Sequence, residues 1–136
     1  ILDLFSGSGS FGIECLSREA IKVVFFENYS EALKVLERNI KSLKNIKNYE
    51  IIKDDCFNFF KSNKINNLKF DIIFMDPPYK ELKINDIIEK IIKENFLKKD
   101  GIIIIHRHKK DLVKLTPKIN IFEERIYGIS KICFGN

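Results

Sequence analysis

The segment Ile1–Gly12 reads ILDLFSGSGSFG, and it decides the fold. Its apolar first part, Ile1–Phe5, predicts a buried strand, and Ser10–Glu19 predicts a short helix directly after it. The glycines between them let the chain turn sharply and let its backbone approach a ligand closely. The N–H groups that begin the helix attract negative charge. This order of strand, glycine-rich turn and helix is typical of the ligand-binding edge of an open α/β sheet.

The rest of the chain continues the alternation of strands and helices. Apolar runs predict strands at Lys22–Glu27, Glu50–Lys53, Phe70–Met75 and Gly101–Ile105, and helical spacing predicts helices at Ser30–Leu43, Asp55–Ser62 and Asn85–Asn95. Two further strands, Ile119–Tyr127 and Ile129–Phe134, meet at Gly128 with no helix between them. The pattern predicts a mainly parallel sheet with helices on both faces and an antiparallel C-terminal hairpin.

Composition excludes several classes of protein. The 136 residues suggest one domain, and the net charge of +5, from 24 basic and 19 acidic residues, permits a polyanionic partner without requiring one. The three cysteines form no C-x-x-C pair, so we expect neither disulfides nor a zinc site, and a cytoplasmic location fits. No apolar run approaches the length of a membrane span. Because the chain opens inside an apolar strand without Met, we expect an N-terminal segment to be missing.

The glycine loop matches two kinds of nucleotide site. Gly7–Gly12 fits the dinucleotide fingerprint G-x-G-x-x-G, and Glu27 closes the next strand about 20 residues later, where a carboxylate accepts hydrogen bonds from ribose hydroxyls. Both an NAD site and an S-adenosylmethionine site place an acid there. Asp3 lies inside the first strand, where a carboxylate faces the positive amino group of a methionine moiety rather than a pyrophosphate. This favours S-adenosylmethionine.

The tetrad Asp76-Pro77-Pro78-Tyr79 follows the fourth predicted strand. The prolines lack N–H groups and force a rigid, extended turn, so the carbonyl of Pro77 is free to accept a hydrogen bond. An aromatic amine is a poor nucleophile, and acceptors on both of its N–H groups, Asp76 and the Pro77 carbonyl, would aim its lone pair at an activated methyl group. Tyr79 is placed to stack on a base that has left its helix.

These motifs resemble the bacterial RsmD-type 16S ribosomal RNA guanine-N2 methyltransferases. The resemblance covers nearly the whole chain and is carried by Asp3–Gly9, Phe11–Arg18, Asp76–Tyr79 and Tyr127-Gly128. The tetrad is shared with DNA adenine-N6 methyltransferases, whereas the run Gly12–Arg18 points to the RNA family. The resemblance implies a class I, Rossmann-like fold with a seven-stranded sheet and one methyltransferase domain over residues 1–136. It also implies a cytoplasmic monomer that methylates guanine N2 in 16S ribosomal RNA, with ribosomal RNA or the small subunit as partner.

The same resemblance assigns roles to residues. Asp76, Pro77, Pro78 and Tyr79 would be catalytic. The cofactor, S-adenosylmethionine or its product S-adenosylhomocysteine, would contact Asp3, Phe5, Ser6, Gly7, Ser8, Gly9, Gly12, Glu27, Asn28, Asp55 and Cys56. The loop Phe5–Gly9 would hold the methionine part and Glu27 the ribose. Asp55 would contact the adenine amino group beside the backbone of Cys56, with Asp54 as a rival.

The chain departs from the family pattern in two places. The basic N-terminal segment that helps the family bind RNA is absent, so we expect this chain alone to bind RNA poorly. After the last parallel strand the sequence has the basic run His106–Lys110, where the family has an acid. The run could touch phosphate, but we favour a solvated loop. We expect no metal site, because its two histidines have no third ligand nearby.

Three rival functions fit less well. A DNA adenine-N6 methyltransferase predicts a larger target-recognition segment than these residues can hold. An NAD-dependent oxidoreductase gives no role to Asp76–Tyr79. A non-catalytic RNA-binding module would be expected to have lost Asp76 or the glycine loop, and both are present.

Overall fold

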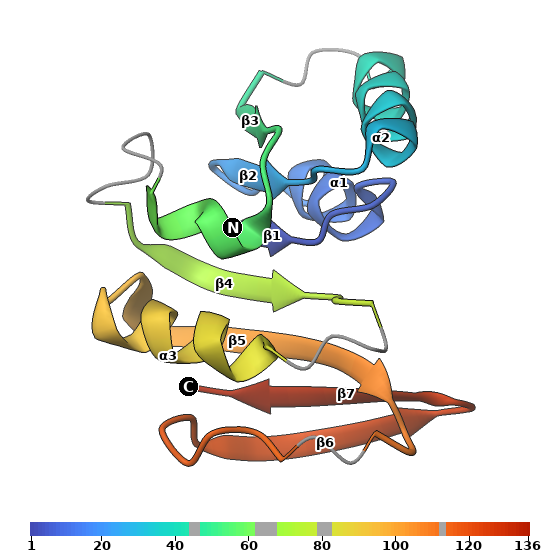
Figure 1. The fold of residues 1–136 in the computed structure, drawn as a ribbon. Helices are drawn as coiled ribbons and strands as arrows, with labels where there is room; N and C mark the ends of the chain where they lie inside the picture. The colour runs from blue at the N-terminus through green and yellow to red at the C-terminus, as the bar shows by residue number, and fades with distance from the viewer. Residues whose placement is uncertain (44–46, 62–67, 79–82, 112–113) are drawn as a thin grey trace. The chain divides into compact units, whose positions relative to one another are not determined.

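A computed structural model describes residues 1–43, 47–61, 68–78, 83–111 and 114–136 (Figure 1). The chain divides into two compact units, residues 1–62 and 63–136. The prediction of a single domain over residues 1–136 is not tested by this division. None of the described helices has both the length and the apolar character that a membrane crossing requires.

The first unit holds three parallel strands and two helices. The strands are β1 (Leu2–Leu4), β2 (Val23–Phe26) and β3 (Tyr49–Ile52), and β2 pairs with both others. The helices are α1 (Ser10–Ser17) and α2 (Ser30–Ser42), and a 3-10 helix, η1 (Cys56–Lys61), follows β3 (Figure 1). All residues of β1 and β2 are buried, as the continuous apolar runs predicted for strands covered on both faces.

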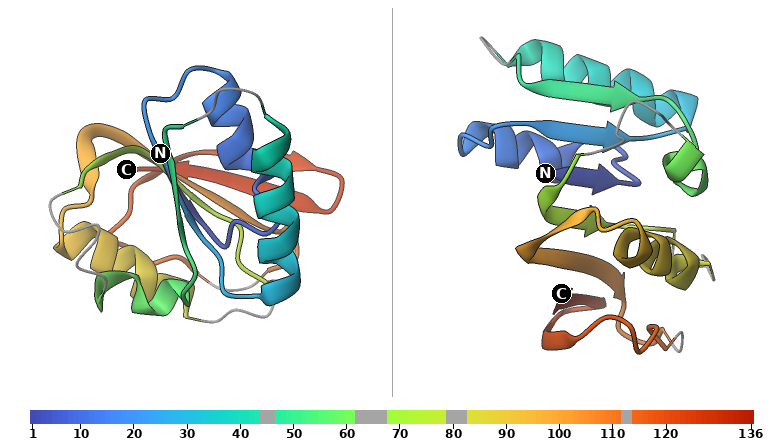
Figure 2. Two further views of the ribbon diagram at one scale, coloured as in Figure 1. Left: turned by 90° about the horizontal axis from the view of Figure 1, so that it is seen from above. Right: turned by 90° about the vertical axis from the view of Figure 1, so that its left-hand side faces the viewer.

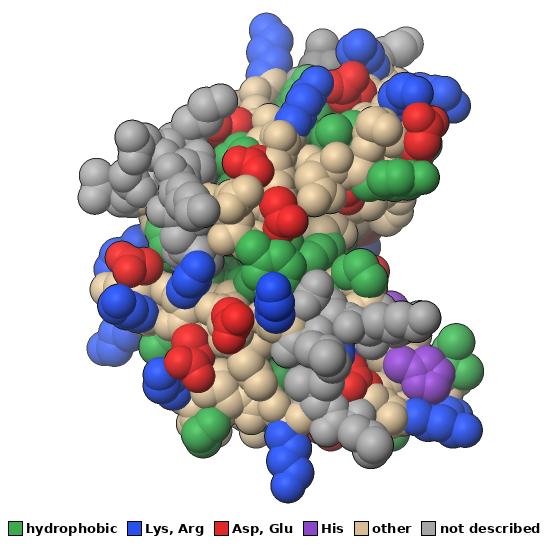
Figure 3. Space-filling model, viewed as in Figure 1, with side chains coloured by type: hydrophobic (Ala, Val, Ile, Leu, Met, Phe, Trp, Pro, Cys, Tyr) green, Lys and Arg blue, Asp and Glu red, His purple; other side chains and the backbone are tan. Residues whose placement is uncertain are grey.

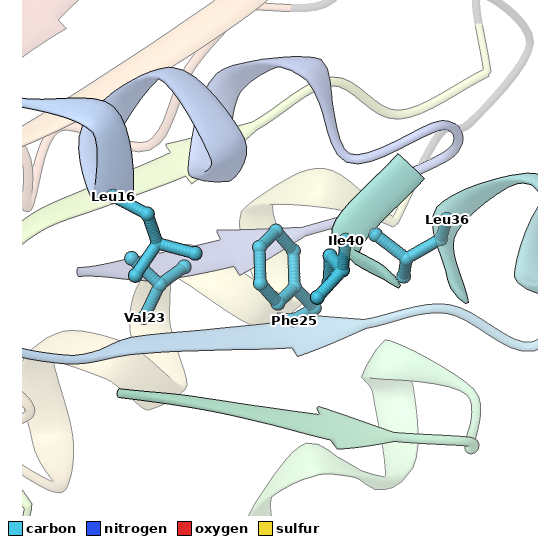
Figure 4. Close-up of a cluster of buried hydrophobic side chains, with 5 residues drawn as sticks. All are labelled: Leu16, Val23, Phe25, Leu36 and Ile40. Carbon is cyan, nitrogen blue, oxygen red and sulfur yellow. The ribbon is translucent and has the colours of Figure 1, made fainter. Parts of the chain in front are cut away.

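The core of the first unit lies where α1 and α2 pack on β2. Figure 4 shows Leu16 of α1 and Leu36 and Ile40 of α2 gathered around Val23 and Phe25 of β2. Leu36 and Ile40 are four residues apart on α2 and are 0% and 3% exposed. A helix brings side chains at this spacing to one face, so the sequence pattern specifies the face that packs on the sheet.

The second unit holds the remaining four strands and one helix. They are β4 (Phe70–Met75), α3 (Ile84–Lys93), β5 (Leu97–His108), β6 (Ile121–Tyr127) and β7 (Ser130–Gly135). β4 and β5 are parallel, whereas β7 is antiparallel to both β5 and β6, as the arrows in Figure 1 show. Figure 2 gives two further views of the ribbon. The antiparallel C-terminal hairpin is therefore confirmed, and with the three strands of the first unit the sheet is mixed, mainly parallel and seven-stranded.

Helix α3 follows the predicted spacing with one exception. Ile84, Ile87, Ile88 and Ile91 are all at most 1% exposed, at the i, i+3, i+4 and i+7 positions of one helical face. The spacing of the isoleucines in Asn85–Asn95 predicts one apolar face that contains Ile87, Ile88, Ile91 and Ile92. For Ile92 this prediction is wrong, because Ile92 is 37% exposed.

Strand β5 is longer than predicted, and this corrects the description of the basic run. The sequence predicted Gly101–Ile105, whereas β5 spans Leu97–His108. Its added C-terminal part is held by the antiparallel neighbour, because His106 pairs with Ile132 and His108 pairs with Ser130. Hydrogen bonds to a neighbouring strand are independent of the polarity of the side chains, so the apolar pattern missed these residues.

Candidate functional site

The loop after β1 is held to the sheet by Ser6. Its hydroxyl donates hydrogen bonds to the carbonyls of Asp3 at 2.7 Å and Phe26 at 3.1 Å, and its N–H donates to the Phe26 carbonyl at 2.9 Å. The Gly9 N–H then donates to the Ser6 carbonyl at 2.7 Å and closes the turn. These contacts fix the shape of the loop Phe5–Gly9 within the first unit.

Two glycines bring α1 close to the rest of the first unit. Gly9 has φ of 79°, and a Cβ built on it would lie 2.2 Å from Leu36 Cδ1. A Cβ on Gly12 would lie 2.2 Å from the Phe25 ring. Gly7 differs, because it has φ of 55° but no described atom within 4 Å of such a Cβ. The space beside Gly7 is what close approach of a ligand to the backbone requires.

Asp3 caps the helix that follows the loop. The N-cap residue of α1, Gly9, has no side chain to accept a hydrogen bond, and Asp3 Oδ2 instead accepts the N–H of Gly12 at 3.1 Å. Asp3 is 1% exposed. A carboxylate at a helix N-terminus is stabilised by the unpaired N–H groups there. The sequence prediction gave Asp3 only a contact with the cofactor amino group and missed this capping contact.

Glu27 joins the end of β2 to the glycine loop. Its Oε2 accepts the N–H of Gly7 at 2.7 Å, and its Oε1 accepts the N–H groups of Asn28 at 2.9 Å and Tyr29 at 2.8 Å. Glu27 is 9% exposed, whereas Asn28 is exposed. A carboxylate has roughly four acceptor positions, so Glu27 keeps capacity for another donor such as a ribose hydroxyl.

The residues predicted at the adenine lie where η1 begins. Asp55 Oδ1 accepts the N–H of Phe57 at 2.8 Å, and Asp54 Oδ1 accepts the N–H of Asp55 at 2.7 Å and the amide of Asn58 at 3.1 Å. Cys56 is 5% exposed. Each carboxylate uses one oxygen in the same way, so the choice between Asp54 and Asp55 stays open.

An aromatic pair links η1 to the glycine loop. The rings of Phe5 and Phe57 meet edge to face, with centroids 6.2 Å apart and planes at 75°. Sequence reasoning missed Phe57, although its place directly after Cys56 could have indicated it. All the residues predicted to bind the cofactor belong to the first unit.

The tetrad begins in the second unit at the end of β4. The side chain of Asp76 is 44% exposed, Pro77 is buried and Pro78 is exposed. Tyr79 lies outside the described residues, so its predicted stacking role stays a prediction. Asp76 Oδ1 lies 2.7 Å from Nδ1 of His106, which is on β5. The carboxylate predicted to hold the target amine thus has a histidine partner that sequence reasoning did not foresee.

The remainder of the basic run divides into a buried and an exposed part. Arg107 is 3% exposed and pairs with Asp111, whereas Lys109 and Lys110 are exposed. The Lys110 N–H donates to His108 Nδ1 at 3.1 Å. The favoured prediction of a solvated loop is wrong for His106, Arg107 and His108, which belong to β5. In the part of the chain that the structure describes, no cluster of three metal-binding side chains occurs.

A family model described as Conserved hypothetical protein 95 matches residues 1–136. The chain belongs to this family, that of the RsmD-type enzymes. The predicted resemblance to the RsmD-type family is thereby confirmed.

Relatives and solved structures agree with the family and the fold. The chain is 34% identical over 125 residues to "Ribosomal RNA small subunit methyltransferase D" of Buchnera aphidicola, covering 92% of this chain and 64% of the relative. A conserved hypothetical protein of Streptococcus pyogenes is 30% identical, with a TM-score of 0.87, covering 99% of this chain and 84% of that one. A ribosomal protein L11 methylase from Lactobacillus delbrueckii is 19% identical, with a TM-score of 0.77 and coverage of 99% and 67%. The predicted class I methyltransferase fold is confirmed.

The RsmD-family chain departs from the family expectation at His106. The family was expected to carry an acid after the last parallel strand, and this chain instead places an imidazole against Asp76. An imidazole can donate or accept one hydrogen bond at Nδ1, depending on its tautomer, whereas a second carboxylate could only accept or repel. The hydrogen bond with His106 therefore affects the orientation of the Asp76 carboxylate and its strength as an acceptor, which the family pattern does not predict.

Proposed function

We propose that residues 1–136 form one methyltransferase domain that transfers a methyl group from S-adenosylmethionine to the exocyclic N2 amine of a guanine in 16S ribosomal RNA. One observation carries the proposal: in an RsmD-family chain, an exposed Asp76 carboxylate stands at the carboxyl end of β4, directly before Pro77-Pro78. Open α/β sheets bind their ligands at this end of their strands. The Buchnera relative's name, a small subunit ribosomal RNA methyltransferase, supports the choice of substrate.

The first unit supplies the cofactor residues in this proposal. The loop Phe5–Gly9 holds the methionine part, with open space beside Gly7 for a ligand. Asp3 faces the cofactor amino group, Glu27 accepts the ribose hydroxyls, and Asp55 or Asp54 accepts the adenine amino group. The cofactor supplies a methyl group already activated by a positive sulfur, so the protein's part is to bind and to orient.

The second unit supplies the acceptors for the target amine. One N–H of the guanine amine donates to Asp76 and the other to the carbonyl of Pro77, which leaves the nitrogen lone pair directed at the methyl group. The nitrogen–carbon bond forms as the sulfur–carbon bond breaks, and the positive nitrogen then loses one proton. Tyr79, which lies outside the described residues, is proposed to stack on the guanine ring.

We also propose that the partner is ribosomal RNA or the small ribosomal subunit, and that the protein acts in the cytoplasm as a monomer. The exposed Lys109 and Lys110 are the members of the basic run that can reach phosphate, because Arg107 is paired with Asp111. On the face drawn in Figure 3, basic and acidic side chains are interspersed. Specificity for RNA is therefore proposed to rest on local contacts rather than on the net charge of +5.

The decisive experiment compares Asp76→Asn with Asp71→Asn in the complete gene product. Asp71 is an exposed carboxylate on the same strand, paired with Lys98 at 2.8 Å, and serves as the matched control. Asp76→Asn should lower methyl transfer to small ribosomal subunits about 100-fold or more, since it replaces an acceptor by a donor. Calorimetric affinity for S-adenosylhomocysteine should stay within about twofold of the wild-type value, the change that about 0.4 kcal/mol produces. Asp71→Asn should leave both quantities unchanged.

Three results would contradict the proposal. Normal turnover by Asp76→Asn would remove the tetrad from the mechanism. Methylation of adenine in DNA in preference to ribosomal RNA would show that the substrate is wrong. Tighter binding of NAD than of S-adenosylhomocysteine would show that the glycine loop belongs to a dinucleotide site.

A further inference from the structure

The imidazole of His106 is in hydrogen-bond contact with the carboxylate that begins the tetrad. His106 Nδ1 lies 2.7 Å from Asp76 Oδ1, and the two side chains are 21% and 44% exposed. We propose that His106 is a positioning residue: its Nδ1–H donates to Asp76 Oδ1, so that Oδ2 is presented to the target amine. This inference rests on the proposed function of Asp76 as the acceptor for that amine.

The sheet register explains why the two side chains meet. Met75, the last residue of β4, pairs with Ile105 of β5, so the next residues along the two parallel strands are Asp76 and His106. Residues paired across a sheet project from the same face. On its other side β5 is held by β7, where His106 pairs with Ile132. The imidazole therefore projects from a strand with neighbours on both edges, which makes it a precise support for a partner.

Asp76 lies where an orienting partner has a large effect on its carboxylate. It follows the last residue of β4, and its carboxylate is the more exposed member of the pair. An exposed carboxylate can rotate about its terminal torsion with little preference. A donor at Oδ1 selects one orientation and leaves the lone pairs of Oδ2 for the substrate. In metal sites, residues that hydrogen-bond to the ligating histidines and carboxylates orient those ligands in the same way.

The proton balance of the reaction is compatible with this arrangement. The sulfur–carbon bond breaks, its electron pair remains on sulfur as a neutral thioether, and the nitrogen–carbon bond forms from the amine lone pair. The positive nitrogen then gives one proton to Asp76 Oδ2, and the resulting carboxylic acid passes it to water. In this proposal His106 keeps its Nδ1 proton throughout and acts on the substrate only through Asp76.

A purely structural role for the pair makes a different prediction. A hydrogen bond between two partly exposed side chains contributes about 0.5–1.5 kcal/mol to stability, and its loss would not alter the rate of methyl transfer by a folded enzyme. The positioning role instead predicts a loss of kcat with little change in KM or in cofactor affinity. It also predicts recovery by a side chain that restores a donor near the position of Nδ1.

The test uses His106→Phe and His106→Asn in the complete gene product. Phenylalanine keeps a ring without a donor, whereas the asparagine amide offers N–H groups close to the position of Nδ1. His106→Phe should lower kcat on small ribosomal subunits by about 10- to 100-fold, the usual effect of removing an orienting partner. KM and the affinity for S-adenosylhomocysteine should stay within about twofold, and His106→Asn should recover most of the rate. In the Asp76→Asn background His106→Phe should cause no further loss, because the two residues act as one unit.

The outcomes separate this proposal from the proposed function. An active wild-type enzyme with normal kcat in His106→Phe, or with equal losses in both His106 variants, overturns the positioning role alone. A wild-type enzyme that transfers no methyl group to the small subunit overturns the proposed function and this inference together. If His106→Phe does not fold, as judged by loss of S-adenosylhomocysteine binding, a kcat for His106→Asn below one tenth of the wild-type value overturns the role, and a higher value supports it.

Discussion

Replacing Glu27 by glutamine should lower the stability of the protein and its affinity for the cofactor. The glutamine carbonyl can still accept the N–H groups of Asn28 and Tyr29, but its amide nitrogen then faces the N–H of Gly7, where Glu27 Oε2 accepts at 2.7 Å. One hydrogen bond to a charged group is lost, which costs roughly 1.5–3 kcal/mol. We therefore expect the free energy of unfolding of the unliganded protein to fall by about 2 kcal/mol.

Two measurements and one control variant test this expectation. Urea unfolding reports the stability of the unliganded protein, and calorimetry should show about tenfold weaker binding of S-adenosylhomocysteine, equivalent to about 1.4 kcal/mol. Glu31→Gln is the control, because Glu31 lies exposed on α2 and forms an ion pair with Lys34, a surface contact that contributes little to stability. If Glu27→Gln is as stable as Glu31→Gln, the carboxylate does not hold the loop and our reasoning on Glu27 fails.

Three further predictions concern the loop, a buried thiol and the basic run. Gly9→Ala should cost about 2–4 kcal/mol in urea unfolding, because it combines a positive φ with a 2.2 Å clash, whereas Gly7→Ala, with open space beside it, should cost about 1–2 kcal/mol. Burial is the largest cause that raises the pKa of the Cys133 thiol from 9.0 to about 11. Because the unfolded chain loses this proton first, stability should fall as pH rises from about 9 to 11, and Cys133→Ala should remove that part of the decline. The double substitution of Lys109 and Lys110 by alanine should weaken RNA binding and reduce the slope of log affinity against log salt by up to about two, and an unchanged slope would place the RNA contact elsewhere.

Much of the fold could be predicted from local apolar patterns. The bounds of β4, Phe70–Met75, were predicted to the residue, because its apolar stretch Ile72–Met75 ends at Asp76 and Phe70 follows the polar Lys69. β5 was predicted too short, since the pairing that extends it to His108 comes from β7, more than twenty residues further along the chain. The segment Asp55–Ser62 was predicted as a helix and contains instead the 3-10 helix Cys56–Lys61, which begins after the side chain of Asp55 turns the chain.

The parts of the candidate site that form a continuous sequence motif could be predicted. The parts that depend on the register between neighbouring strands were missed. The glycine loop and Glu27 could be predicted because strand, turn and strand end follow one another in the sequence. The contact of His106 with Asp76 could not, because it depends on which residue of β5 lies beside Met75. The capping role of Asp3 was missed for a similar reason, since its partner Gly12 lies beyond the turn in α1.

The backbone conformation of Phe5 limits which substitutions the core of the first unit can accept during evolution. Its φ of 62° is a left-handed conformation that costs a residue with a side chain roughly 1–2 kcal/mol. Such a conformation persists only while its surroundings over-determine it, here through the bonds of Ser6 to Asp3 and Phe26. A core substitution that loosens these neighbours would release the turn while the chain is still folded. A substitution at a buried position such as Phe26 should therefore abolish ligand binding before it unfolds the protein. Purifying selection at such positions should then be stronger than the stability of the fold alone would require.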